Sequence, residues 1–194
     1  GEEWGKNLCD AVETVAALKG TRRVRLGSLE PDAMTDDVIR RLAGQPKLCP
    51  QFHLALQSGC DATLKRMNRH YTTAEYEAVC RELRRCFPHC ALTTDVMVGF
   101  PGEDETEFAE SFSFVQKIGF SKVHVFSYSP RPGTPAAKAP KQVPGSQEAK
   151  RSHEMIAMCN KQRDDYLFSQ LGTTTDVLLK PRHGDGYGEG LTPL

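Results

Sequence analysis

The fold is decided by residues 92–119, LTTDVMVGFPGEDETEFAESFSFVQKIG, and by what surrounds them. Residues 92–99 form an apolar run with β-branched side chains, which predicts a strand. Asp104 and Glu107 have the spacing of a helix-capping pair ahead of an apolar stripe, and Gly119 is placed to end that helix. The stretch therefore predicts a strand, a glycine-containing turn and a helix in immediate succession.

Three further β-type runs lie outside this stretch, with helical patterns between them, and they cover residues 23–29, 52–57 and 122–127. Thr35 is placed to cap a short helix, and Thr72 with Glu75 has the capping-box spacing of another. Strands that alternate with helices at intervals of roughly 30 residues predict parallel strands joined by right-handed crossovers. The predicted fold class is therefore α/β, with parallel βα repeats.

The two ends of the chain do not follow this alternation of strands and helices. A helical pattern closed by Gly20 precedes the first strand, and since such a helix ordinarily follows a strand, we expect earlier residues to precede this chain. Residues 129–144 are rich in proline and predict an ordered loop or a linker. Ser146 is placed to cap a long helix that ends near residue 172. Residues 175–179 then predict the first strand of another domain.

Composition excludes several classes of protein. The 194 residues include 25 Lys and Arg and 25 Asp and Glu, so the formal net charge is zero and a generally basic nucleic-acid-binding protein is excluded. The chain is shorter than the about 250 residues of a closed eight-stranded α/β barrel. No apolar run approaches the ~20 residues that cross a bilayer. The seven cysteines have no regular spacing, which argues against a disulfide framework. We therefore expect a protein of the reducing cytoplasm, with no membrane partner.

The predicted binding site lies at the carboxyl ends of the strands, because ligands of parallel α/β sheets bind there. The candidate binding residues are the polar and glycine residues at these ends, with one arginine beyond the second strand: Ser28, Gln57, Ser58, Arg69, Asp95, Gly99 and Ser127. Asp95 lies among valines, where an isolated carboxylate is costly unless it has a partner or a ligand. Arg69 has the planar fork that binds a carboxylate. Ser28 and the pair Gln57 and Ser58 are equally compatible with plain turns at strand exits.

Metal and nucleotide motifs are not evident in the sequence. It contains neither the G-x-G-x-x-G pattern of dinucleotide-binding folds nor the P-loop pattern. Cys86 and Cys90 come before the third strand, at the edge opposite the predicted site, and Thr93 stands where a third cysteine of a cluster loop would be. Four single histidines have no spaced partner, namely His53, His70, His124 and His153. No metal ligand and no catalytic residue is therefore assigned.

One segment has an uneven charge. Residues 117–147 hold five Lys or Arg and no acid, with Phe126 and Tyr128 between them. Such a segment is typical of a protein surface that follows phosphates, and equally of a solvated proline-rich loop.

Three motifs follow one another in order: LQSGCDATLKRMNRHYT at 56–72, TDVMVGFPGE at 94–103 and FSYSPRPGTPA at 126–136. Together they resemble the radical S-adenosylmethionine (SAM) methylthiotransferases over roughly residues 22–136. Cys60, directly after Gln-Ser-Gly, resembles the branch that acts on N6-threonylcarbamoyladenosine of tRNA more than the isopentenyladenosine or ribosomal-protein branches.

The resemblance implies three parts: an N-terminal domain with an auxiliary iron–sulfur cluster, an open TIM-like (β/α)6 radical SAM barrel, and a C-terminal RNA-binding TRAM domain. On this interpretation residues 1–145 are the C-terminal portion of the partial barrel, 146–172 a long connecting helix, and 173–194 a truncated start of a TRAM-like β domain. The implied cofactors are SAM and [4Fe–4S] clusters. Since this chain lacks a cysteine motif for the clusters, we expect it to be inactive alone.

The resemblance also implies roles around bound SAM. It assigns the ribose to Gln57 and Asp95, the methionyl carboxylate to Arg69, the same cavity to Ser28, and the adenine to the backbone of residues 98–100 and to Ser127.

The implied reaction is addition of a methylthio group to C2 of N6-threonylcarbamoyladenosine at tRNA position 37, through the 5′-deoxyadenosyl radical formed from SAM. Tyr-Ser-Pro-Arg-Pro-Gly-Thr argues against another radical SAM enzyme such as a porphyrinogen oxidase relative. Other methylthiotransferase branches remain alternatives, as does a non-catalytic RNA-binding module built on residues 117–147. The expected partner is tRNA, and an unpaired edge at residues 23–29 favours self-association.

Overall fold

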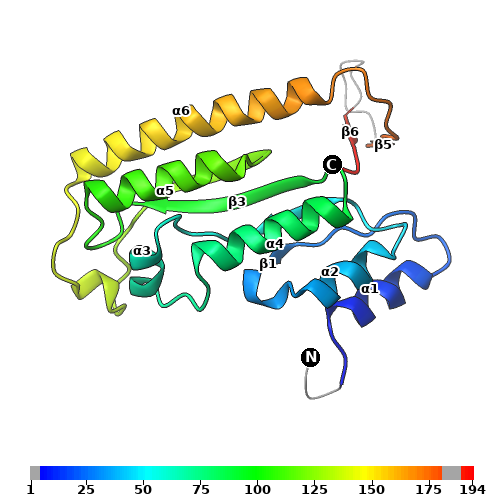
Figure 1. The fold of residues 1–194 in the computed structure, drawn as a ribbon, viewed down its shortest axis with the longest axis horizontal. Helices are drawn as coiled ribbons and strands as arrows, with labels where there is room; N and C mark the ends of the chain where they lie inside the picture. Colours follow the sequence, from blue (N-terminus) through cyan, green and yellow to red (C-terminus); the bar gives the residue numbers. More distant parts are fainter. Residues whose placement is uncertain (1–4, 181–188) are drawn as a thin grey trace.

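The computed structural model describes residues 5–180 and 189–194 (Figure 1). Four parallel strands form a sheet in the order β1 (Ser28–Leu29), β2 (Gln51–Leu54), β3 (Ala91–Val98) and β4 (Lys122–Ser127). The α-helices are α1 (Leu8–Ala17), α2 (Asp36–Ala43), α3 (Asp61–Arg66), α4 (Thr73–Cys86), α5 (Glu105–Ile118) and α6 (Gly145–Ser169). Short 3-10 turns cover Pro31–Ala33 and Ala136–Lys138. The predicted α/β fold with parallel βα repeats is confirmed.

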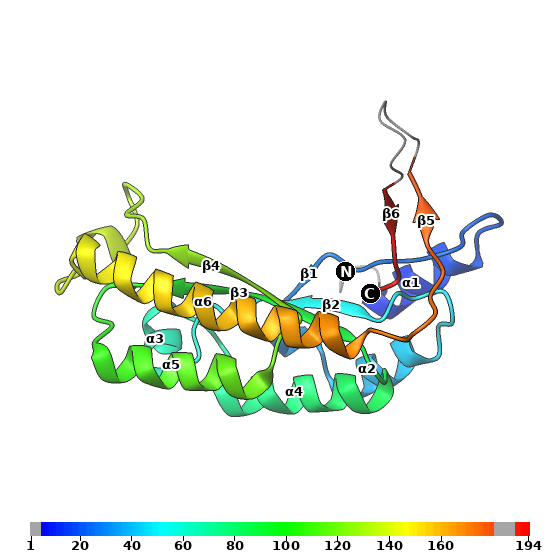
Figure 2. The same ribbon diagram turned by 90° about the horizontal axis from the view of Figure 1, so that it is seen from above.

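The sheet has two unlike faces. Figure 2 shows α2 to α5 together on one side of the sheet, which we call the helix face, and we call the other side the open face. Side chains of β3 alternate between the two: Leu92, Thr94, Val96 and Val98 are buried, whereas Thr93, Asp95 and Met97 are partly exposed. This period of two places the apolar core under the helices and leaves polar groups of the strands on the open face.

The first strand is shorter than predicted, while β3 and β4 lie within one residue of the predicted runs. Of residues 23–29 only Ser28–Leu29 pairs as a strand, and Val24 makes a single isolated bridge. The cause lies in the partner segment, where Pro50 has no N–H and the N–H of Gln51 bonds to the carbonyl two residues earlier. The segment before β2 therefore has no donor left for the middle of the predicted strand.

The second strand is interrupted by a bulge. Within β2 the register joins Gln51 to Ala91, whereas Gln57 pairs with Val96, so one extra residue lies on the β2 side. The Gln57 N–H donates to the carbonyl of Asp95 at 2.8 Å, with a left-handed backbone at φ 67°. For a residue other than glycine this conformation costs about 1–2 kcal/mol. The surrounding contacts must therefore hold the chain in this shape.

Three hydroxyl groups bind the backbone groups that the bulge leaves unpaired. The N–H of Leu56 donates to Thr94 Oγ1 at 3.0 Å, and Thr94 Oγ1 itself donates to the carbonyl of Leu54. The Tyr76 hydroxyl donates to the same carbonyl at 2.9 Å, and the Tyr71 hydroxyl lies 2.7 and 3.0 Å from the next two carbonyls. Because Thr94 and Tyr76 are fully buried, no water replaces these bonds.

Several helix ends follow the predicted signals, but α1 ends at Ala17 with Leu18 as its C-cap, before the predicted Gly20, and α6 ends at Ser169 instead of near residue 172. Thr72 and Glu75 form both bonds of the capping box at the start of α4, and Gly119 ends α5 in the left-handed conformation. The predicted cap at Ser146 is wrong. Helix α6 begins two residues earlier, with Pro144 as the N-cap, whose carbonyl accepts the N–H groups of Gln147 and Glu148 at 2.9 and 3.0 Å.

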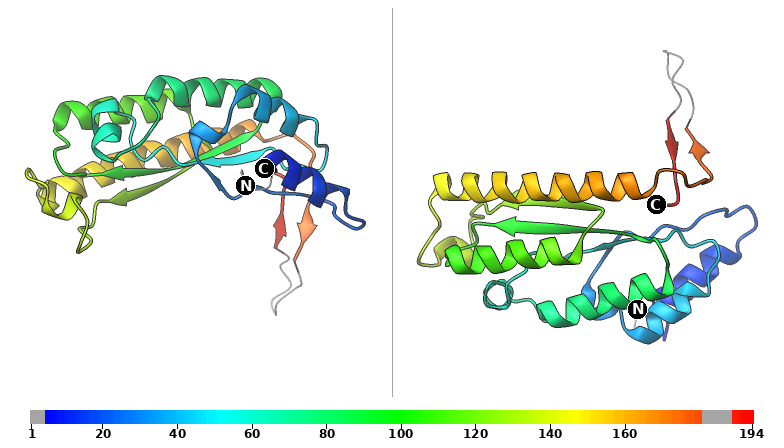
Figure 3. Two further views of the ribbon diagram at one scale, coloured as in Figure 1. Left: turned by 90° about the horizontal axis from the view of Figure 1, so that it is seen from below. Right: turned by 45° about the horizontal axis from the view of Figure 1, so that its top comes forward.

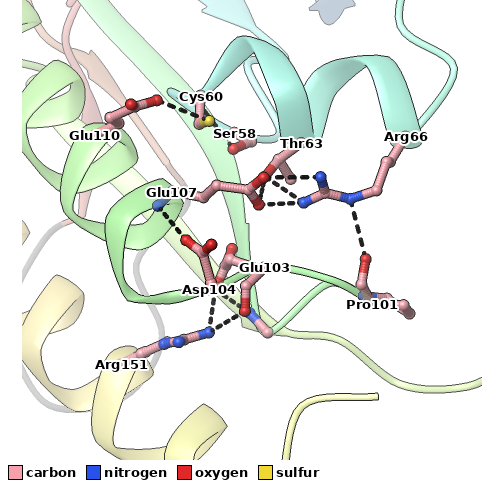
Figure 4. Close-up of polar contacts among 11 residues, drawn as sticks. Ser58, Cys60, Thr63, Arg66, Pro101, Glu103, Asp104, Glu107, Glu110 and Arg151 are labelled. Atoms are coloured by element: carbon pink, nitrogen blue, oxygen red, sulfur yellow. Dashed lines mark hydrogen bonds and ion pairs between the residues drawn. The ribbon is translucent and has the colours of Figure 1, made fainter. Parts of the chain in front are cut away.

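The turn after β3, residues 99–104, is held from two sides by arginines of distant helices (Figure 4). From α6, Arg151 donates to the carboxylate of Glu103 at 2.9 Å and to its carbonyl at 3.0 Å. From α3, Arg66 donates to the carbonyl of Pro101 at 3.2 Å and pairs with a glutamate of α5. The turn is thereby fixed to helices that lie far from it in the sequence.

The contact from α6 is buried. The side chains of Arg151 and Glu103 are 2% and 1% exposed, and the Glu103 carboxylate also accepts the N–H of Gly99 at 2.9 Å. Burial raises the pKa of Glu103, while the Gly99 N–H and the Arg151 guanidinium act in the opposite direction. Gly99 has φ 77°, and a Cβ there would lie 2.5 Å from the side chain of Glu148. Only glycine fits at this position.

The C-terminal segment forms a small antiparallel hairpin of β5 (Leu178–Leu179) and β6 (Gly190–Leu191). Figures 2 and 3 show these strands projecting from the open face, on the side opposite α4 and α5. Arg23 donates to the carbonyls of Asp176 and Leu191 at 3.0 and 2.9 Å, which joins the hairpin to the segment before β1.

The predicted division of the chain at residues 145 and 172 stays a prediction, as does self-association through the β1 edge. Within the described residues β1 is the outermost strand on its side of the sheet. Of the strand predicted at 175–179, only β5 (Leu178–Leu179) is formed, and residues 181–188, which follow it, lie outside the described residues.

In residues 5–180 and 189–194 we find no helix that combines the length and the apolar character needed to span a membrane. All seven cysteines are free thiols.

We expect Thr94→Val to lower the free energy of unfolding by about 1–3 kcal/mol, because it leaves the buried Leu56 N–H without a partner, while the Leu54 carbonyl keeps only the Tyr76 hydroxyl. Urea denaturation measures this change. Thr21→Val is the matched control, since the partly exposed Thr21 side chain makes no hydrogen bond to the described residues, and its effect should stay within about 0.5 kcal/mol. Equal losses in the two variants would refute the role given to Thr94.

We expect Arg151→Met to lower the free energy of unfolding by about 3–5 kcal/mol, because it leaves the Glu103 carboxylate buried without its cation. Combining it with Glu103→Gln should recover part of the loss, since the buried charge is then removed. The control is Lys150→Met, whose side chain is 70% exposed and should change stability little. A double variant no more stable than Arg151→Met would contradict the buried-charge explanation.

Candidate functional site

A cavity of about 490 Å³ lies at the carboxyl ends of β3 and β4, where the sequence predicts the site. Its wall combines the two strand ends, the turn after β3 and the loop after β4, chiefly through Met97, Phe100, Phe126, Ser127, Tyr128 and Arg131. The contacts of Arg66 and Arg151 therefore hold one wall of the cavity, because Phe100 belongs to the turn that they fix.

The cavity wall is mostly apolar and aromatic. Met97 and Phe126 are register partners on β3 and β4, and Phe126 is 51% exposed. The rings of Phe100 and Tyr128 meet edge to face, with centroids 5.4 Å apart. The Tyr128 hydroxyl is buried and has no hydrogen-bond partner among the described residues. A wall of this kind binds a flat aromatic ring by stacking, with a few polar atoms to orient it.

A cluster of polar side chains continues from the cavity along the open face. His53 Nε2 lies 3.4 Å from Asp95 Oδ2, and His53 Nδ1 lies 2.9 Å from Thr93 Oγ1. His124 on β4 is the register partner of Asp95, and its ring centroid lies 6.2 Å from that of His53. The side chains of His53 and Asp95 are 19% and 30% exposed, so a ligand on the open face can reach them.

Four of the residues predicted from the sequence lie along connected strand positions. Ser127 lines the cavity, and Asp95 lies on the open face two residues before Met97 of its wall. Gln57 is bonded to the Asp95 backbone, and Ser28 is the register partner of His53, the residue that contacts Asp95. The parallel sheet thus brings these strand ends together.

Three other predicted residues have contacts elsewhere. Ser58 is fully buried, and its hydroxyl accepts the N–H of Cys60 at 3.3 Å. The N–H of Gly99 is bonded to Glu103, so it is not free for a ligand. Arg69 pairs with Glu30 at 3.3 Å near the end of β1. None of these three belongs to the cavity wall, and their roles stay predictions.

The histidines that lacked a partner in the sequence are better connected than expected. The structure brings His53 and His124 to the same face, next to Asp95. The alternation of β2 and β4 could have indicated that both side chains share a face. Their proximity depends on the register across three strands, however, and no spacing along the chain carries that information.

Metal binding has no support among residues 5–180 and 189–194, which contain no group of three or more His, Cys, Asp or Glu placed to hold a metal ion. Cys86 contacts Glu82 at 3.6 Å, and Cys90 is buried before β3. The described residues therefore offer no ligand set for an iron–sulfur cluster.

Comparison with known proteins identifies the family of this chain. The Radical SAM superfamily model matches residues 6–115, more than half of the chain. The tRNA-2-methylthio-N(6)-dimethylallyladenosine synthase of Corynebacterium urealyticum is 40% identical over 167 residues, which are 86% of this chain and 31% of that protein. The threonylcarbamoyladenosine tRNA methylthiotransferase of Thermotoga maritima is 38% identical over 84% of this chain and 37% of that protein.

The chain thus spans about a third of the length of these curated relatives. Among solved structures, coproporphyrinogen III oxidase from Escherichia coli, a radical SAM enzyme, has a similar fold, with a TM-score of 0.59 and 18% identity over 72% of this chain and 32% of that one. The matches show that the chain belongs to the radical SAM superfamily, which implies SAM and [4Fe–4S] clusters as cofactors, and within it to the methylthiotransferase family.

Proposed function

We propose that this chain forms the SAM-binding part of a tRNA methylthiotransferase, with the cavity at β3 and β4 as the nucleoside site. The observation that carries the proposal is the position of Asp95, which lies on the open face of β3 two residues before Met97, a wall residue of the aromatic cavity at the carboxyl ends of the parallel strands. A carboxylate beside a slot for a flat ring matches the chemistry of a nucleoside, which has a diol next to a base.

The residues present fit SAM in three respects. Met97 and Phe126 form an apolar wall for the adenine, with the ring of Tyr128 beside them. Asp95 is placed to accept hydrogen bonds from the ribose, with Gln57 on the adjacent strand. Arg69 can bind the methionyl carboxylate if it exchanges its contact with Glu30, which is 60% exposed and therefore weakly held.

When bound with a reduced [4Fe–4S] cluster, SAM supplies the radical that activates a substrate C–H bond. No step of the proposal runs through the clusters, because the described residues hold no ligand set for them. The parts assigned to this chain are to bind SAM, to orient its ribose and to cover its adenine.

The proposed substrate is N6-threonylcarbamoyladenosine of tRNA, modified at C2 at position 37. Relatives with the dimethylallyl and the threonylcarbamoyl names are about equally similar, at 40% and 38% identity. The finer choice is supported by the Gln-Ser-Gly-Cys sequence at 57–60. Cys60 itself lies 3.0 Å from Glu110 of α5, away from the cavity, so it marks a branch of the family and does not contact the substrate.

The other proposed properties follow from this reaction. The partner is tRNA, for which Arg131 in the cavity wall and the basic segment 117–147 supply positive charge. The residues from 173 onward are proposed as the start of a TRAM-like domain. The proposed location is the cytoplasm, in agreement with seven free thiols.

We expect Asp95→Asn to weaken binding of SAM to this chain at least tenfold, about 1.4 kcal/mol, because the charge-assisted bonds to the ribose become neutral. Isothermal titration calorimetry measures the dissociation constant. Asp165→Asn, at an exposed position of α6, is the matched control and should bind like the unchanged chain. Equal affinity of Asp95→Asn and the unchanged chain would remove Asp95 from the site.

The substrate assignment is tested with the cluster-loaded holoenzyme and two tRNAs, one with N6-threonylcarbamoyladenosine and one with isopentenyladenosine at position 37. We expect mass spectrometry to detect the methylthio product from the first tRNA and not the second, and Asp95→Asn to abolish it. Product from the isopentenyl tRNA alone would move the protein to the other branch. Unchanged modification by Asp95→Asn would favour the non-catalytic RNA-binding role for this chain.

A further inference from the structure

A chain of side-chain hydrogen bonds crosses the open face from Arg25 to His53, whose ring lies next to Asp95. An Nη of Arg25, before β1, lies 2.8 Å from Gln51 Oε1 at the start of β2. Gln51 Nε2 lies 3.3 Å from Thr93 Oγ1 on β3, and Thr93 Oγ1 lies 2.9 Å from His53 Nδ1. The other ring nitrogen of His53 faces Asp95 at 3.4 Å.

The first member of the chain sets the direction of the others. Arg25 can only donate hydrogen bonds, so the Gln51 atom beside it is the carbonyl oxygen and the atom toward Thr93 is the NH2 group. The Gln51 amide therefore donates to the Thr93 hydroxyl. The amide orientation, which is ordinarily ambiguous, is fixed here by the chemistry of its neighbour.

The Thr93 hydroxyl passes this direction on to the histidine. A hydroxyl that accepts from Gln51 still has its single proton to donate, so it can donate to His53 Nδ1. The direction is fixed from the other end, because the Asp95 carboxylate can only accept. The nitrogen that faces it, Nε2, therefore carries the proton of the neutral ring, and Nδ1 is the acceptor. Every donor in the chain points the same way, from Arg25 toward Asp95, and bonds in such series strengthen one another.

We propose that His53 is a positioning residue, held by Thr93 in the Nε2–H tautomer so that it holds Asp95 Oδ2 and leaves Oδ1 for the ligand. This inference rests on the proposed SAM site, and it adds a residue that acts on the ligand through Asp95. The contact of 3.4 Å is longer than an ordinary hydrogen bond, as contacts in ligand-free sites often are.

The far end of the chain is also fixed. Arg25 donates through its second Nη to the carbonyls of Thr192 and Pro193, at 2.8 and 3.2 Å. Because both nitrogens of its guanidinium are engaged, Arg25 is held in the orientation that directs Gln51. On the β4 side His124 lies opposite Asp95 and is the neighbour of His53 across the sheet.

The tautomer is tested by 15N NMR of the histidine side chains in this chain at neutral pH, where the two ring nitrogens give distinct signals in each tautomer. We expect His53 to show a protonated Nε2 and an unprotonated Nδ1. Thr93→Val should mix the two tautomers, since the donor to Nδ1 is lost, and Thr93→Ser should restore the single tautomer. A His53 signal of the Nδ1–H form in the unchanged chain would overturn the inference.

The positioning role is tested by SAM binding in a double-mutant cycle. We expect Thr93→Val and His53→Leu each to weaken binding three- to tenfold, Thr93→Ser to bind normally, and neither change to have a further effect once Asp95→Asn is present. His153→Leu, at an exposed position of α6, is the control. Circular dichroism and thermal melting identify any variant that fails to fold. If one does, SAM binding by Thr93→Ser and the histidine NMR signals still test the positioning role of His53.

The outcomes separate the two proposals. If Asp95→Asn weakens binding while Thr93→Val and His53→Leu do not, the positioning role is wrong and the proposed site stands. If Asp95→Asn itself has no effect on SAM binding, the proposed site fails and the role of His53 fails with it, whatever tautomer the ring adopts.

Discussion

The hydroxyl group of Thr94 is the contact on which the site depends most. It lies in the middle of β3 on the helix face, where it accepts the N–H of Leu56 and donates to the carbonyl of Leu54. With Tyr76 and Tyr71 it stabilises an extra residue in β2 that would otherwise leave buried backbone groups unpaired. An unpaired polar group in a buried network costs free energy, whereas a fully paired network favours a single conformation. The network around Thr94 therefore holds the strand end beside Asp95 in one conformation.

The two faces of the sheet have different roles: the helix face forms the apolar core, and the open face carries the proposed binding residues. On the helix face the apolar side chains of β3 pack under α4 and α5, and on the open face the same strand presents Thr93, Asp95 and Met97. The turn that follows β3 joins the two functions, because α6 holds it through Arg151 and Phe100 of the same turn lines the cavity. The shape of the cavity therefore depends on a helix that contributes none of its principal wall residues.

Much of the fold could be predicted from local signals. The capping box at Thr72 and Glu75 and the glycine at 119 act within one helical turn, so the sequence alone locates those helix ends. The bulge in β2 could not be predicted, since its partners come from β3 and α4. Asp95 could be singled out because a carboxylate among valines is unusual, whereas His53 could not, since its partner Thr93 lies 40 residues away. Contacts across strands need the register, which the sequence does not state.

The left-handed backbone of Gln57 has a consequence for attempts to improve this protein. The conformation disfavours any residue other than glycine or asparagine by about 1–2 kcal/mol. Directed evolution for heat resistance alone would consequently enrich Gln57→Gly, and the resulting protein would survive higher temperatures with its amide lost. At Gln57 a gain in thermal stability costs the side-chain amide, so a thermostable variant for engineering should be sought by substitutions at other positions.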